Sequence, residues 1–128
     1  MKGGNQTPNA KIKQRDLVSF GFSELKEISY TSAKNDSIFF VNFLKRLSKL
    51  CQLEWSQLYI TGRHSFGTET ISVDNLKESA RNLIPDGMTK LIVLRTSGNN
   101  HAFLGYRDKS IFQIMFIEYN FGDVYEHN

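Results

Sequence analysis

Side chains that can exchange protons or stabilise negative charge gather in the last third of the sequence and in one polar loop. The stretch from His101 to Tyr119, HAFLGYRDKSIFQIMFIEY, sets His101, Tyr106 and Arg107 among bulky apolar residues. The same residue types occur at Arg63 and His64 in a loop between two glycines, and at Arg95, Tyr125 and His127. Histidine and tyrosine can act as acids or bases, and arginine can balance charge that builds up during a reaction.

These residues do not form a metal motif or a phosphate loop. Histidines occur only at positions 64, 101 and 127, without helical i,i+4 spacing and without a cluster of carboxylates. Cys51 is the only cysteine, which excludes an intramolecular disulfide and a cysteine zinc site, and its apolar surroundings predict a small buried residue. No glycine-rich loop follows a strand. We therefore expect neither a metal ion nor a cofactor.

The composition is typical of one globular domain. The chain has 128 residues, of which 40% are hydrophobic and 23% charged, so one core can serve it. We expect this domain at residues 16–128, after a flexible basic arm at residues 1–15. The sequence has no apolar segment of signal-peptide or membrane-spanning length, which favours a cytoplasmic location and no membrane partner.

Positive charge is concentrated in the amino-terminal half. The net charge is +3; up to His64 there are ten Lys or Arg residues against five acids, and from Ser65 onward six against eight. Clustered cations attract phosphates, so this asymmetry favours a polyanion or an acidic partner. An ordinary solvated surface would also explain it.

Three helices are predicted from apolar spacing and end signals. The longest is NDSIFFVNFLKRLSKLCQLEW, capped by Asp36 or Ser37. Its expected buried stripe contains Phe40, Phe43, Leu44, Leu47, Leu50 and Cys51. The opposite face carries Lys45, Arg46 and Lys49, which are either a solvated surface or phosphate contacts. Shorter helices are expected in EWSQLYITG and from Asp74 to about Leu83.

The carboxyl-terminal part is predicted to be sheet. The strands KLIVLRT, HAFLGYR and SIFQIMFIEY are joined by the turns SGNN and DK, and LVSFGF forms an earlier strand. A brief strand is also expected at the end of the loop GRHSFGTETIS. The expected fold is α+β, an antiparallel sheet of about four strands with two to three helices packed on one face.

Side-chain parity in this sheet predicts one open face if Asp108 and Lys109 form the last turn. The aromatic face, which includes His101, is expected under the helices. The other face collects a mixed set of polar residues among aliphatic ones: Arg95, Tyr106, Gln113 and Tyr119. This face is either a binding surface or a set of strand ends whose polar tips reach water.

The element order and the stretch HAFLGYRDKSIFQIMFIEYNFGDVY resemble the RelE/ParE superfamily of small bacterial toxins. In that superfamily the final strands carry a basic residue and a turn before an apolar strand, and a short tail carries Tyr, His or Arg. Here the tail DVYEHN offers Tyr125 and His127 beside the acidic Asp123 and Glu126. The helix beginning at Asp74 is an insertion by this comparison.

The resemblance implies RNA cleavage on a ribosome without a metal ion, and a partner antitoxin. Such cleavage needs a base for the 2′-hydroxyl, an acid for the leaving 5′-oxygen and cations for the charge on phosphorus. By this comparison the catalytic candidates are Arg95, Arg107, His64 and Tyr119. The RNA-binding candidates are Arg63, Tyr106, Gln113, Lys45, Arg46 and Lys49. Further proton carriers or stacking groups are His101, Tyr125 and His127.

Two other functions fit the sequence. The protein could be a non-enzymatic module, encoded on a mobile element, that binds a protein or a nucleic acid through the same face of the sheet. It could also be a small inhibitor that blocks an enzyme through its basic helix.

Overall fold

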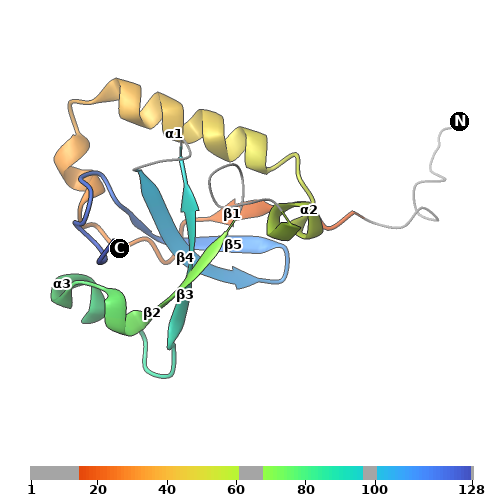
Figure 1. The fold of residues 1–128 in the computed structure, drawn as a ribbon. Coiled ribbons are helices and arrows are strands. Elements are labelled where there is room, and N and C mark those ends of the chain that lie inside the picture. The colour runs from red at the N-terminus through yellow and green to blue at the C-terminus, as the bar shows by residue number, and fades with distance from the viewer. Residues whose placement is uncertain (1–14, 61–67, 97–100, 128) are drawn as a thin grey trace, which may run out of the picture.

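A mixed five-stranded sheet forms the centre of the protein in a computed structural model that describes residues 15–60, 68–96 and 101–127 (Figure 1). The strand order is β1-β5-β4-β3-β2, with β1 parallel to β5 and the other neighbours antiparallel. The strands are β1 (Ser19–Gly21), β2 (Glu69–Ser72), β3 (Lys90–Arg95), β4 (Ala102–Asp108) and β5 (Ile111–Ile117). The helices are α1 (Ser37–Leu50), α2 (Trp55–Ile60) and α3 (Glu78–Arg81), with 3-10 turns η2 (Tyr30–Ala33) and η3 (Val73–Asn75). The predicted α+β class is confirmed, with five strands where about four were expected.

The longest helix, α1, forms because its apolar residues follow helical spacing and because Asp36 caps it. The Oδ1 atom of Asp36 accepts a hydrogen bond from the backbone N–H of Phe39 at 3.0 Å, which confirms the predicted cap. The side chains that α1 buries are Phe39, Phe43, Leu47 and Leu50. The predicted stripe was wrong at Leu44, which is 62% exposed, and in the first turn, where Phe39 is buried more deeply than Phe40.

We expect Leu47→Ala to lower the free energy of unfolding by about 2–5 kcal/mol, because it opens a cavity between α1 and the sheet. Leu44→Ala is the same substitution on the same helix at an exposed site. It should change the free energy of unfolding by less than about 0.5 kcal/mol. Urea denaturation followed by circular dichroism measures both values. Equal losses would show that α1 packs on the sheet through a different face.

The hairpin between β4 and β5 turns one residue later than predicted. Asp108 pairs with Ile111, so the turn residues are Lys109 and Ser110, and Lys109 adopts a φ of 59°. Tyr106 therefore lies opposite Gln113, two positions from the partner expected. A shift of two residues keeps each side chain on its predicted face, because the side-chain period of a strand is two.

A bulge then reverses the faces for the rest of β5. The register shifts between Leu104 and Gly105. A Cβ atom at Gly105 would lie 1.8 Å from the carbonyl oxygen of Gln113, so only glycine permits this approach of the two strands. The extra residue in β5 turns Phe116 away from α1 and Ile117 toward it. Both placements are opposite to the predicted ones.

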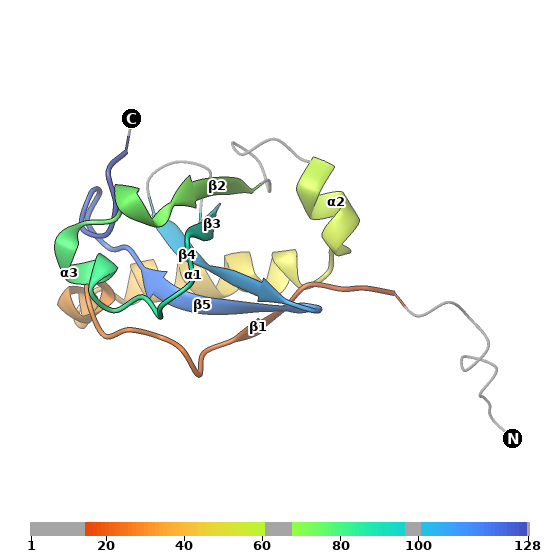
Figure 2. The same cartoon turned by 90° about the horizontal axis from the view of Figure 1, so that it is seen from below.

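Both faces of the sheet are covered (Figures 1 and 2). On one face α1 and α2 pack against a cluster that includes Phe103 and Phe112. On the other face α3 and the carboxyl-terminal segment pack on the aliphatic residues of the central strands. This second cluster includes Leu76, Ala80, Leu91, Val93, Leu104, Met115, Val124 and Tyr125. The prediction of an open sheet face is therefore wrong.

The segment predicted as a third helix is only partly helical. It consists of η3, an extended residue pair and the short helix α3. Leu76 and Ala80 are buried as predicted, but Leu83 is 41% exposed. Cys51, predicted to be buried, is half-buried, and burial raises the pKa of its thiol. In the part of the chain that the structure describes, no helix is long and apolar enough to span a bilayer.

Candidate functional site

One end of the sheet gathers polar side chains from several strands. β3 and β5 end there, while β2 and β4 begin there. We call this region the polar end and define it by Asp36, Glu69, Arg95, Thr96, His101, Glu118, Tyr119, Tyr125 and His127. Among the described residues the buried polar side chains are Thr96 and Glu118, and both lie here. Buried polar groups need hydrogen-bond partners, so their concentration marks this end for closer description.

Glu118 holds the carboxyl-terminal segment against the sheet. Its side chain is fully buried, and its Oε1 atom lies 2.6 Å from Nε2 of His127. Its Oε2 atom accepts hydrogen bonds from the backbone N–H groups of Val124 at 2.8 Å and Tyr125 at 3.4 Å. A buried carboxylate is costly unless it is hydrogen-bonded in this way. Three donors from the tail therefore depend on one side chain of the sheet.

The contacts of His127 fix both the orientation and the tautomer of its ring. The imidazole lies between Phe121 and Tyr125, with centroid separations of 3.9 and 3.8 Å, and its side chain is 7% exposed. A carboxylate accepts hydrogen bonds and donates none, so Nε2 must carry the proton that faces Glu118. In the neutral form of this ring, the other nitrogen, Nδ1, keeps its lone pair. A histidine oriented by a buried carboxylate is the usual arrangement of a general base.

Two arginines flank the end of β3. Arg95 donates from Nη2 to Oε1 of Glu69 at 3.1 Å and to the hydroxyl of Tyr125 at 3.2 Å, and its side chain is 13% exposed. Burial is the main cause that raises the pKa of Tyr125, so its phenol stays protonated beside His127. From the α1 side, Nε of Arg46 donates to the carbonyl oxygen of Thr96 at 2.8 Å.

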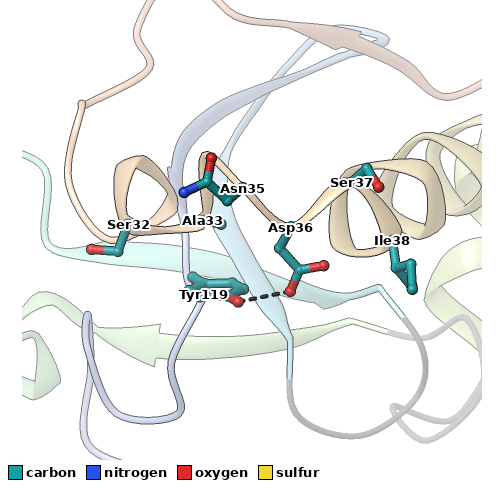
Figure 3. A pocket seen from close by; sticks show the side chains of 7 residues that line it. All are labelled: Ser32, Ala33, Asn35, Asp36, Ser37, Ile38 and Tyr119. Atoms are coloured by element: carbon teal, nitrogen blue, oxygen red, sulfur yellow. Dashed lines mark hydrogen bonds between the residues drawn. The ribbon is translucent and has the colours of Figure 1, made fainter.

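A cleft lies on the α1 side of the polar end (Figure 3). Its centre is the hydrogen bond that the Tyr119 hydroxyl donates to Oδ2 of Asp36 at 2.7 Å. Two hollows of about 360 and 250 Å³ share Asp36 and Ile38. The first is lined by Ser32, Ala33, Asn35, Asp36, Ser37, Ile38 and Tyr119, and the second by Asp36, Ile38, Phe39, Asn42, Thr96 and His101.

The hydrogen bonds of the cleft set the charge of its side chains. The bond from Tyr119 is the main cause that lowers the pKa of Asp36, and the same bond is the main cause that raises the pKa of Tyr119. Burial lowers the pKa of His101 despite the nearby charges of Glu118 and Asp36. The Nδ1 atom of His101 is buried and has no hydrogen-bond partner within the described ranges. At neutral pH the cleft thus contains a carboxylate, a phenol and a neutral imidazole.

We expect Tyr119→Phe to make the stability of the protein less dependent on pH at both extremes. The folded pKa of Asp36 lies below the ordinary 3.8, so its contribution is complete above that value and is lost as the pH falls through the folded pKa. The folded pKa of Tyr119 lies above 10.0, so its contribution is complete below that value and is lost as the pH rises. Urea denaturation across the pH range measures this, with Tyr30→Phe as the matched control. Parallel curves for the wild type and Tyr119→Phe would contradict the assignment.

Arg107 lies at the opposite end of the sheet from Arg95. It forms an ion pair with Asp16, Nη2 to Oδ2 at 2.8 Å, and its guanidinium carbon lies 4.4 Å from the ring centroid of Trp55. Arg95 pairs with Ala102, five positions before Arg107 on β4; at about 3.3 Å per residue the two lie roughly 17 Å apart. The structure therefore does not bring together the two arginines named as catalytic candidates.

Of the residues predicted to form one open surface, Arg95, Tyr106 and Gln113 do share a face of the sheet, but that face is covered and Tyr119 lies on the other one. Tyr106 packs against the second cluster, and the side chain of Gln113 lies against Gly21. Tyr119 faces α1, because the bulge reverses the end of β5. His101, by contrast, faces α1 as predicted, with its ring centroid 4.9 Å from that of Phe39.

The predicted cations of α1 have different surroundings. Lys45 and Lys49 are exposed, whereas Arg46 is half-buried at the end of β3. Arg63 and His64 lie outside the described residues, as does the predicted arm except for Arg15. No prediction for these residues is tested.

Four residues of the polar end were not singled out for chemistry in the sequence: Asp36, Glu69, Thr96 and Glu118. Glu118 was predicted only as part of an apolar strand, and Asp36 only as a helix cap. The signal for Asp36 was incomplete, because a cap motif says nothing about Tyr119, which is 83 residues away. The partner of Glu118 is nine residues away in an irregular segment, and no periodicity connects them.

Comparison with known proteins adds no identity. No family model matches the chain, and no curated protein or solved structure matches it significantly. The resemblance to RelE/ParE toxins stays a prediction. Within residues 15–60, 68–96 and 101–127, no three His, Cys, Asp or Glu side chains are grouped so that they could hold a metal ion.

Proposed function

We propose that the protein binds RNA and cleaves it at the polar end by acid–base chemistry that uses its own side chains. The observation that carries this proposal is the pair formed by buried Glu118 and His127, 2.6 Å apart, with Arg95 and Tyr125 beside it. The tail of the RelE/ParE toxins, which this sequence resembles, carries Tyr, His or Arg, and the tail of this chain offers Tyr125 and His127. A cytoplasmic location and a partner antitoxin belong to the same proposal.

In the proposed reaction His127 is the general base. Its Nδ1 atom takes the proton of a ribose 2′-hydroxyl, and the 2′-oxygen attacks the adjacent phosphorus. The bond from phosphorus to the 5′-oxygen breaks, and that oxygen takes a proton from solvent. The products are a 2′,3′-cyclic phosphate and a 5′-hydroxyl. Glu118 stabilises the imidazolium that forms, and Arg95, which donates to the hydroxyl of Tyr125 beside His127, stabilises the developing phosphorane charge.

Basic residues along α1, which begins at the polar end, support RNA as the substrate. α1 carries Lys45, Arg46 and Lys49 and no acidic residue. Arg46 donates to the carbonyl oxygen of Thr96, and Thr96 directly follows Arg95 at the end of β3. Cations in such a row bind a phosphate backbone with an affinity that falls as salt rises. RNA would then extend from the polar end along α1.

The test is to incubate the purified protein with single-stranded RNA in the presence of a chelator, with and without ribosomes. Cleavage that leaves a 2′,3′-cyclic phosphate is expected, and a matched oligonucleotide with 2′-deoxyribose at the cleaved position should stay intact. Cleavage of the deoxy substrate would rule out the 2′-hydroxyl mechanism. Intact RNA both with and without ribosomes would rule out the enzymatic proposal.

The second candidate function is a non-enzymatic binding module. The observation that favours it is a row of exposed apolar side chains on α1: Ile38, Val41 and Leu44, which are 72%, 48% and 62% exposed. Exposed apolar side chains next to lysines are typical of an interaction surface. For this candidate, salt-sensitive binding of RNA or of an acidic protein is expected without any cleavage.

A further inference from the structure

We propose that the cleft beside Asp36 binds an alkylammonium group, that is, a primary ammonium at the end of a hydrocarbon chain. This inference is independent of RNA cleavage, because it concerns the α1 side of the polar end and needs neither His127 nor Arg95. Four features of the cleft support it: its charge, its hydrogen-bonding capacity, the engagement of both carboxylate oxygens and the apolar side chain at its rim.

The cleft carries one negative charge among neutral groups. Asp36 is the one ionised side chain that lines the two described hollows, since the low pKa of His101 keeps its imidazole neutral. Among the described residues no lysine or arginine forms an ion pair with Asp36. Two cations flank the cleft without lining it: exposed Lys34, two residues before Asp36, and Arg46, which donates to the carbonyl oxygen of Thr96. Charge complementarity therefore favours a cation and disfavours a phosphate at Asp36.

The cleft presents acceptors that a donor-only ligand would satisfy. The Asp36 carboxylate can accept about four hydrogen bonds. Oδ1 accepts from Phe39 N–H and Oδ2 from the Tyr119 hydroxyl, so capacity is left on the carboxylate. The Tyr119 hydroxyl gives its only proton to Asp36 and keeps an oxygen lone pair. The buried Nδ1 of neutral His101 is a further acceptor when the proton is on Nε2. An ammonium has three donors and no acceptor, which matches this set.

The contacts of Asp36 favour an ammonium over a guanidinium. A guanidinium binds a carboxylate best through two parallel hydrogen bonds, one to each oxygen. Here each oxygen of Asp36 already accepts a hydrogen bond from the protein. A compact ammonium needs only one further position on the carboxylate.

The rim of the cleft provides an apolar surface for the chain that carries the ammonium. Ile38 lines both hollows and is 72% exposed. Val41, one turn later on α1, is 48% exposed. Methylene groups pack on such side chains while the charged end binds elsewhere. The ligand class is therefore an amine with a short hydrocarbon chain, either a free small amine or a lysine side chain of another protein.

The test is a titration of the protein with n-butylammonium, followed by the amide signals of residues 36–39 in NMR spectra. Butan-1-ol and butanoate serve as probes with the same chain and a different charge. Saturable shifts are expected with butylammonium alone. Asp36→Asn should weaken its binding about tenfold, because asparagine keeps the helix cap and removes the charge. Asp86→Asn, which removes a charge from an exposed turn, is the matched control and should leave the affinity unchanged.

The same titration separates the two sources of the ligand. Tighter binding of 1,5-diaminopentane than of N-acetyl-lysine methylamide would assign the cleft to a small amine, and the reverse order would assign it to a protein lysine. The proposal is overturned if butanol or butanoate binds as well as butylammonium, if no probe gives saturable shifts, or if Asp36→Asn binds like the wild type. None of these results depends on whether the protein cleaves RNA.

Discussion

Replacing Glu118 with glutamine should slow the proposed RNA cleavage by about 10²- to 10⁴-fold while the protein stays folded. The carboxylate of glutamate has two acceptor oxygens, whereas the amide of glutamine has one acceptor oxygen and one NH₂ group that donates. Its oxygen can still accept from the backbone N–H groups of Val124 and Tyr125, which bond to Oε2 of Glu118. Its NH₂ group then faces Nε2 of His127, which must become the acceptor. The proton of the neutral ring moves to Nδ1, and the proposed base is lost.

Single-turnover cleavage rates of the wild type and Glu118→Gln measure this effect. Glu126→Gln is the control, because the Glu126 side chain is 63% exposed and pairs only with Lys77 in the described structure. The control should cleave at the wild-type rate. A Glu118→Gln protein that is folded and fully active would show that His127 is not the base.

Replacing Glu118 with alanine should lower the free energy of unfolding by about 3–5 kcal/mol. The substitution leaves three buried or half-buried donors without their acceptor: the N–H groups of Val124 and Tyr125 and Nε2 of His127. It also opens a cavity at a fully buried position. The carboxyl-terminal segment, which covers one face of the sheet, would lose its main polar attachment.

Urea denaturation of Glu118→Ala and Glu126→Ala measures this difference. The exposed ion pair of Glu126 with Lys77 contributes about 0–1 kcal/mol, so Glu126→Ala should be nearly as stable as the wild type. Similar stabilities for the two variants would mean that the tail is held by its apolar residues alone.

The elements that are fixed by local patterns were predicted well. α1 follows from helical spacing and from the Asp36 cap, and the strands of the β4–β5 hairpin follow from their apolar runs. The faces of β5 could not be predicted beyond Ile114, because the bulge at Gly105 depends on how two strands meet. A single extra residue exchanged the positions of Phe116 and Ile117.

The polar end was predictable only as separate residues. Arg95, Tyr125 and His127 were candidates from their chemistry, and the structure brings these three together. Their link to Glu118 could not be predicted, because the irregular tail has no periodicity that sets its path. The parity argument failed to predict the covered sheet face for the same reason, since Val124 and Tyr125 of that tail help to bury it.

The central claim is that Glu118 holds His127 with its proton on Nε2 and a lone pair on Nδ1. Nitrogen-15 NMR of the histidine side chains measures this directly, because protonated and unprotonated ring nitrogens have well-separated signals. For the neutral form of His127 we predict a protonated Nε2 and an unprotonated Nδ1 in the wild type, and the reverse in Glu118→Gln. A wild-type His127 with its proton on Nδ1 would contradict the proposed base and the mechanism built on it.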